Sequence, residues 1–225
     1  MLILPCAVVL DCEDEEQWRT HDELWTKALP ALHWTTVAVA RGEKLSMETL
    51  WAAQGILLTG SHHCATDASL PWRAMLVDAM QQLVQGPVPP GTTRPQIVGV
   101  CFGCQLLADC LGGSAGPNPD SSFVLRCEEW RPCSSAGCSH GPCAALRTAA
   151  EGTALRIIET HGDCVVELPA CAHVLCSSDS CSHELFSLAP NGMSLVRTPH
   201  TAETSSVSAY FCSAWDARTS RVPSR

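Results

Sequence analysis

The sequence predicts an α/β fold, a three-layer sandwich in which helices cover both faces of a mostly parallel central sheet. Short apolar runs that suit buried strands alternate with segments of helical periodicity through the first half of the chain. Gly and Pro clusters separate these segments, as expected for turns between regular elements. The length of 225 residues suits one domain with a single core.

The first sixty residues predict a β-α-β-α-β order. The elements expected are, in chain order, a strand over 2–10, a helix over 18–32, a strand over 33–40, a short helix over 46–50 and a strand over 55–58. Acidic residues precede the first helix, where they favour the N-terminal turn. Ser46 has the side chain that caps a helix N-terminus by accepting a backbone hydrogen bond.

A longer helix is predicted over 70–84, where apolar residues recur at helical spacing and Gly86 and Pro87 end the pattern. A short Pro-rich loop leads to a strand over 96–100. That strand is followed at once by a helix over 101–110, which Gly112 and its neighbour close. A strand that feeds directly into a helix places residues at the carboxyl edge of a parallel sheet, where sites form in this class of fold.

The second half is less regular. Residues 117–147 are rich in Pro, Ser, Cys and Gly, and we expect a loop or hairpin excursion with strand character only over 123–125. Further strands are expected over 154–159, 172–177 and 183–188. We expect one domain over 1–203 and a divergent, poorly ordered tail over 204–225, because periodicity is lost there.

A sharp turn is predicted where the strand over 96–100 meets its helix. Residues 99–103 read Gly-Val-Cys-Phe-Gly, with Gly two residues before and two residues after the cysteine. Gly at these positions removes Cβ atoms that would clash in a strand-to-helix turn, and the turn lifts the central side chain clear of the sheet. The helix N-terminus would lower the pKa of this thiol. Cys101 is therefore the predicted nucleophile.

This turn and two further segments resemble class I glutamine amidotransferases. Residues 99–108, Gly-Val-Cys-Phe-Gly-Cys-Gln-Leu-Leu-Ala, are similar to the Gly-x-Cys-x-Gly-x-Gln segment of that family. Residues 54–61 resemble its strand and Gly-Ser turn, and residues 160–169 resemble its His-x-Asp-x-Val, Leu-Pro stretch. The resemblance covers residues 50–190 and favours the stand-alone branch that includes γ-glutamyl peptidases. It implies a flavodoxin-like arrangement of the three-layer sandwich.

The resemblance also implies a cysteine hydrolase that acts on glutamine or on γ-glutamyl amide and peptide bonds. Cys101 would attack the carbonyl carbon and form a thioester, which water then hydrolyses. Backbone groups of Phe102, Gly60 and Ser61 would hold the oxyanion. The residues that would line the substrate side are Gln105, His161 and Asp163. We expect no cofactor and no metal, and a small glutamyl compound as the substrate.

The general base departs from the pattern of the family. A Gly-His-Pro-Glu segment would be expected on a late strand, whereas residues 197–203 read Arg-Thr-Pro-His-Thr-Ala-Glu. His200 and Glu203 are the predicted base and its carboxylate, and His161 is a second candidate for the base. An interval of three residues would place the two side chains on opposite faces of a strand. The alternative function is therefore a catalytically impaired relative that acts as a binding or regulatory protein.

Two other interpretations come from the cysteines. Cys101 and Cys104 form a C-x-x-C pair at a helix start, which is also typical of dithiol redox sites. Two groups suggest zinc instead: Cys133, Cys138 and Cys143 with His140, and Cys171, Cys176 and Cys181 with His173 and His183. Their five-residue intervals differ from the spacing of common zinc sites.

Charge and cysteine usage limit the partners and the compartment. The net charge is −9, from 14 Lys and Arg against 23 Asp and Glu, so no long-range field attracts nucleic acid or anionic lipid. The apolar segment 1–10 is interrupted by Pro5 and is shorter than the about 20 residues that span a bilayer. We therefore expect no nucleic-acid or membrane partner. The 15 cysteines are odd in number and lack the spacing of a secreted scaffold, which favours the cytoplasm.

Overall fold

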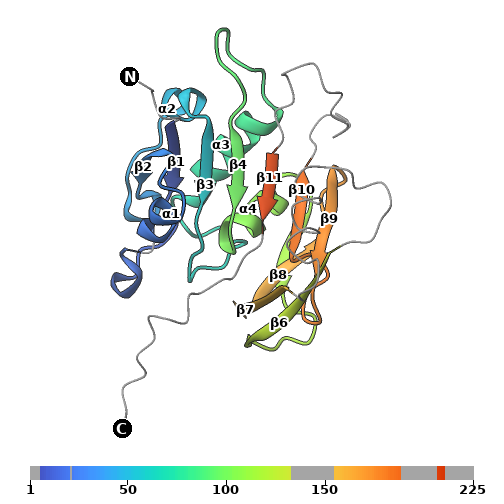
Figure 1. The fold of residues 1–225 in the computed structure, drawn as a ribbon. Coiled ribbons are helices and arrows are strands. Elements are labelled where there is room, and N and C mark those ends of the chain that lie inside the picture. Colours follow the sequence, from blue (N-terminus) through green and yellow to red (C-terminus); the bar gives the residue numbers. More distant parts are fainter. Residues whose placement is uncertain (1–5, 21, 133–154, 189–206, 211–225) are drawn as a thin grey trace.

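A parallel sheet of four strands forms the centre of the protein in the computed structural model, which describes residues 6–20, 22–132, 155–188 and 207–210 (Figure 1). The strand order is β2-β1-β3-β4. These strands are β1 (Cys6–Leu10), β2 (His33–Val37), β3 (Gly55–Leu58) and β4 (Gln96–Gly99), and every neighbouring pair is parallel. The parallel strands predicted for the first half of the chain are confirmed.

Helices follow the strands in the predicted order. They are α1 (Asp22–Ala28), α2 (Met47–Ala52), α3 (Arg73–Gln85) and α4 (Phe102–Cys110), with single 3-10 turns η1 (Glu16–Trp18) and η2 (Val39–Arg41). Ser46 caps α2, since its Oγ accepts a hydrogen bond from the backbone N–H of Thr49 at 3.2 Å. No helix of the described residues is long and apolar enough to cross a membrane.

Alternate residues of the central strands face two separate helical layers. Val8 of β1 and Leu58 of β3 pack in one cluster with buried side chains of α3 and α4. Val9 and Leu57, their neighbours in the sequence, point to the other face and pack with Trp25 of α1. Side chains of a strand alternate between faces, so apolar residues in succession require cover on both sides. The predicted three-layer α/β sandwich is confirmed.

Antiparallel strands extend this core, and the sequence predicted them only in part. The five-stranded sheet has the order β11-β10-β9-β6-β7 and consists of β6 (Val124–Pro132), β7 (Leu155–His161), β9 (Ala172–Ser177), β10 (Leu185–Leu188) and β11 (Val207–Tyr210). A separate pair joins β5 (Ser114–Pro117) to β8 (Asp163–Glu167). Strand β11 lies beside β4, so the antiparallel sheet adjoins the parallel one (Figure 1).

Strand β6 is longer than predicted. Strand character was expected only over 123–125, but β6 continues to Pro132 because it pairs with β7 from Val124 to Trp130 and with β9 at Arg131 and Pro132. Such pairing overrides a weak local strand preference. The predicted tail, 204–225, contains β11, which pairs with β10. Other residues of the tail, and residues 133–147 of the excursion, lie outside the described residues, so the domain boundary stays a prediction.

Helix α4 approaches the sheet so closely that one of its positions has no room for a side chain. A Cβ atom added at Gly103 would lie 2.6 Å from both Cβ and the carbonyl oxygen of Leu58 in β3. One of these atoms belongs to the backbone of a buried strand and cannot move aside independently. The position of α4 on the sheet therefore depends on Gly103.

We predict that Gly103→Ala lowers the free energy of unfolding by about 1–3 kcal/mol, the usual cost of overpacking a core. Helix propensity alone predicts the opposite, since Ala is favoured over Gly inside helices by about 1 kcal/mol. Urea unfolding followed by circular dichroism measures the difference. The control is Gly55→Ala, where the nearest atoms to an added Cβ are 3.9 Å away. A Gly103→Ala protein as stable as this control would contradict the close approach.

Candidate active site

Cys101 stands at the turn between β4 and α4 in a backbone conformation that side chains rarely adopt. Its φ is 50° and its ψ is −112°. Such a conformation costs on the order of 1–3 kcal/mol and persists where the surroundings impose it. Gly99 is part of those surroundings, because a Cβ there would lie 2.6 Å from the carbonyl carbon and oxygen of Gly103. The predicted strand-to-helix turn is confirmed.

The backbone N–H groups of Phe102 and Ser61 lie near enough to the Cys101 sulfur to lower the pKa of its thiol. Phe102 is the first residue of α4, where backbone N–H groups have no partner within the helix. Ser61 belongs to the turn after β3, and this turn passes so close that a Cβ on Gly60 would lie 3.4 Å from Cys101 Cβ. The residues predicted to hold the oxyanion thus lie around Cys101, while their role stays a prediction.

Desolvation has the largest effect on the pKa of the Cys101 thiol. Burial raises the pKa of this thiol to about 11; the N–H groups of Phe102 and Ser61 lower it, and the charges of Glu159 and Asp163 raise it further. The expectation that the helix N-terminus lowers this pKa is wrong for the net effect, because desolvation of a thiolate outweighs the backbone donors. At neutral pH Cys101 is a thiol until a base removes its proton.

The three residues predicted for the substrate side gather where β7 turns into β8. Gln105 is buried in α4, and its Nε2 donates to the carbonyl oxygen of Asp163 at 3.0 Å. His161 ends β7 and is buried, with Nδ1 2.9 Å from Oδ1 of Asn118. Burial lowers the pKa of His161, which favours the neutral imidazole. The Gln105 contact ties α4 to β8, and the substrate roles of the three stay predictions.

The predicted base and its carboxylate, His200 and Glu203, lie outside the described residues. They precede β11, which begins at Val207 beside β4. Their pairing with Cys101 therefore stays a prediction.

Cys104, the other member of the C-x-x-C pair, belongs to the core. It is fully buried among apolar side chains of the main cluster. Burial raises the pKa of its thiol well above the ordinary value, and the charges of Cys101 and Glu184 act in the same direction. Reactive cysteines need an accessible, readily formed thiolate. The burial of Cys104 therefore favours a single nucleophile at Cys101 over a dithiol pair.

The zinc interpretation gains no support from the described cysteines. The group of Cys133, Cys138, Cys143 and His140 lies outside the described residues. Within the described ranges, no three residues of the second group bring their ligand atoms together.

Two histidines follow the oxyanion turn and fix it to an acidic loop after β1. His62 Nδ1 lies 2.6 Å from Oε1 of Glu13, and its backbone N–H donates to Oε2 of the same carboxylate at 2.9 Å. His63 Nε2 lies 2.9 Å from Oδ1 of Asp14. Because Glu13 is buried, this contact holds the Gly60-Ser61 turn against the sheet.

Buried acidic groups surround the site, and no sequence pattern pointed to them. Glu159 of β7 and Glu184, just before β10, are both fully buried. Trp130 Nε1 donates to Glu159 at 2.5 Å, and Ser178 Oγ donates to Glu184 at 2.5 Å. Burial raises the pKa of both carboxyls, that of Glu184 to about 8. The two residues are 25 positions apart and meet only through strand pairing, so periodicity cannot reveal them.

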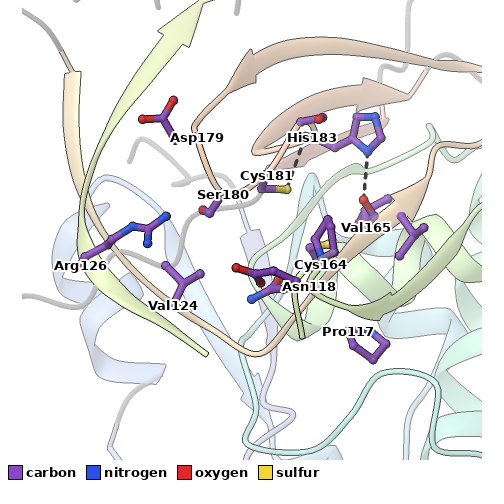
Figure 2. Close-up of a pocket in the computed structure, with 14 residues that line it drawn as sticks. Pro117, Asn118, Val124, Arg126, Cys164, Val165, Asp179, Ser180, Cys181 and His183 are labelled. Carbon is purple, nitrogen blue, oxygen red and sulfur yellow. Dashed lines mark hydrogen bonds between the residues drawn. The ribbon is translucent and has the colours of Figure 1, made fainter. Parts of the chain in front are cut away.

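A cavity of about 410 Å³ lies between β5, β6, β8 and the turn that precedes β10 (Figure 2). Asn118, Cys164 and Cys181 lie around its centre in Figure 2. His183 also lines it, with Nδ1 2.9 Å from the carbonyl oxygen of Val165. Cys101 is not among the residues that line this cavity.

Comparison with known proteins agrees with the resemblance seen in the sequence. No family model matches the chain. A Saccharomyces cerevisiae protein named as a candidate glutamine amidotransferase is 26% identical over 138 residues, which make up 59% of this chain and 47% of that protein. The match therefore spans about half the length of the curated relative.

Two solved structures have a similar fold. A glutamine amidotransferase from Thermotoga maritima superposes with a TM-score of 0.61 at 16% identity, over 82% of this chain and 72% of that one. A glutamine amidotransferase from Methylobacillus flagellatus superposes with a TM-score of 0.59 at 20% identity, over 83% and 66%. These matches show that the chain has a glutamine amidotransferase fold.

We predict that alkylation of Cys101 by iodoacetamide accelerates about tenfold per pH unit from pH 7 toward its pKa of about 11, since only the thiolate reacts. Mass spectrometry of the Cys101 peptide measures the rate. The exposed thiols of Cys64 and Cys127 serve as internal controls and should react faster at pH 8. A Cys101 that reacts faster than these controls at pH 7 would contradict the raised pKa and would show that a base already activates the thiol.

Proposed function

We propose that this chain, which has a glutamine amidotransferase fold, is a cysteine hydrolase acting on glutamine or γ-glutamyl amide bonds. The observation that carries the proposal is the place of Cys101 at a strained strand-to-helix turn beside the Gly60-Ser61 turn, where the N–H groups of Phe102 and Ser61 lower the pKa of its thiol. A carbonyl carbon attacked by that sulfur would place its oxygen within reach of the same two donors. Donors fixed in advance stabilise the developing negative charge without reorganisation.

The proposed reaction has two halves. In the first, the Cys101 sulfur bonds to the carbonyl carbon while a base takes the thiol proton, and the negative charge collects on the carbonyl oxygen. Collapse of this intermediate breaks the C–N bond, the proton passes to the nitrogen, and ammonia or an amine leaves. In the second half, water adds to the thioester, glutamate leaves, and the Cys101 thiol is restored.

The base in this scheme is His200, with Glu203 as its carboxylate. A thiol whose pKa lies at about 11 needs such a base at neutral pH, because the thiolate fraction is otherwise very small. The substrate would be a small glutamyl compound. We also place the protein in the cytoplasm, since the described cysteines are free thiols and reducing compartments keep them so.

The second candidate function is that of a catalytically impaired relative that binds a ligand or a regulatory partner. The observation that favours it is the charge around the nucleophile. Glu159 and Asp163 both raise the pKa of Cys101, whereas a catalytic thiolate gains from positive neighbours. The fold and the turn at Cys101 would then serve binding rather than turnover.

We predict that Cys101→Ala lowers kcat/KM for release of ammonia from glutamine, or of p-nitroaniline from γ-glutamyl-p-nitroanilide, by at least about 10³-fold, because the covalent step is lost. Cys104→Ala is the matched control. It removes a neighbouring thiol that lies in the core and should retain activity close to that of the unchanged protein.

Three other outcomes would count against the hydrolase. Equal loss of activity in both variants, together with reversible oxidation, would indicate a dithiol site. Full activity in Cys101→Ala would exclude the thioester. An unchanged protein with no turnover of either substrate would favour the binding function.

A further inference from the structure

Three side chains that commonly bind metal ions meet in the interior of the protein. Glu159, His161 and Glu184 are all buried, and their ligand atoms lie within 4.8 Å of one another. Glu159 and His161 are two residues apart on β7, so both side chains point to the same face of that strand. Glu184 comes from the turn that enters β10. We propose that these three residues bind a divalent metal ion of the manganese and zinc class.

An unmatched carboxylate oxygen points to a missing positive partner. The Glu184 side chain is fully buried, and Oε1 accepts a hydrogen bond from Ser178 Oγ. Its Oε2 has no hydrogen-bond partner among the described residues. Buried carboxylates are normally hydrogen-bonded throughout, paired with a cation or bound to a metal. A divalent ion would supply the partner that Glu184 Oε2 lacks among the described residues.

Each of the three side chains is also held by a second residue. Asn118 lies 2.9 Å from His161 Nδ1, so in the proposed site Nε2 would be the coordinating nitrogen. Trp130 donates to Glu159, and Ser178 donates to Glu184. Metal ligands are typically oriented by such outer hydrogen bonds, and a histidine ligand almost always uses its other ring nitrogen in this way. The cluster therefore has the support expected of a metal site.

The spacing fits a metal after a small adjustment. Ligands that bind at about 2.0–2.2 Å lie no more than about 4.4 Å apart across the ion. The longest spacing here, up to 4.8 Å, would close by a slight movement of the side chains. Two carboxylates with one imidazole suit Mn²⁺ or Zn²⁺. Asn118, which lies beside His161 Nδ1, also lines the cavity of about 410 Å³ (Figure 2).

The experiment uses Mn²⁺, because the 15 cysteines of the chain would bind Zn²⁺ at other places. The full chain is titrated with Mn²⁺, and the free ion is followed by electron paramagnetic resonance. We expect one Mn²⁺ per chain, with affinity at least about tenfold weaker in Glu184→Gln and in Glu159→Gln. Gln retains the acceptor for Ser178 or Trp130 while removing the charge. Glu129→Gln, an exposed change on β6, is the control and should bind like the unchanged protein.

Thermal unfolding gives an independent readout. Mn²⁺ should raise the melting temperature of the unchanged protein and of Glu129→Gln, and should leave that of Glu184→Gln unchanged. The metal site is overturned if the unchanged protein binds Mn²⁺ more weakly than about 1 mM, or if Glu184→Gln binds as tightly as the control. These outcomes are independent of turnover at Cys101, since no step of the proposed hydrolysis uses the metal.

Discussion

The close contact of α4 with the parallel sheet is the constraint on which the candidate site depends. Gly103 lies against Leu58 of β3, and Gly99 lies against Gly103, so neither position has room for a Cβ atom. With both ends of the turn fixed, the residue between them takes a positive φ, and that residue is Cys101. The same contact brings the start of α4 beside the turn after β3. The sulfur therefore meets N–H groups from two separate segments of the chain.

Two opposing electrostatic effects act on that sulfur. The N–H groups of Phe102 and Ser61 stabilise negative charge, whereas burial and the carboxylates of Glu159 and Asp163 oppose it, and the opposing effects prevail. In the proposed hydrolysis, the same N–H groups would stabilise charge that develops on a bound carbonyl rather than charge on a free thiolate. The proposed reaction therefore needs a base to activate Cys101, because the thiolate is disfavoured without one.

Short sequence patterns correctly predicted the elements whose structure depends on residues close together in the sequence. The strand, the Gly spacing and the helix around Cys101 all act within ten residues, and so does the Ser46 cap. The length of strand β6 was underestimated because pairing with β7 stabilises a segment whose own residues have only a weak strand preference. The proximity of Glu159 and Glu184 follows from antiparallel pairing across the whole second sheet, which no spacing encodes. The pKa of Cys101 was misjudged because its burial depends on the complete fold.

The proposed hydrolysis requires Cys101 to accept a glutamyl group through its sulfur. Acid quenching soon after mixing with a γ-glutamyl substrate, followed by peptide mass spectrometry, tests this step. We expect a mass increase of one glutamyl group on the peptide that contains Cys101, and hydroxylamine should remove it because the linkage is a thioester. No such adduct under conditions of turnover, or an adduct that persists in Cys101→Ala, would contradict it.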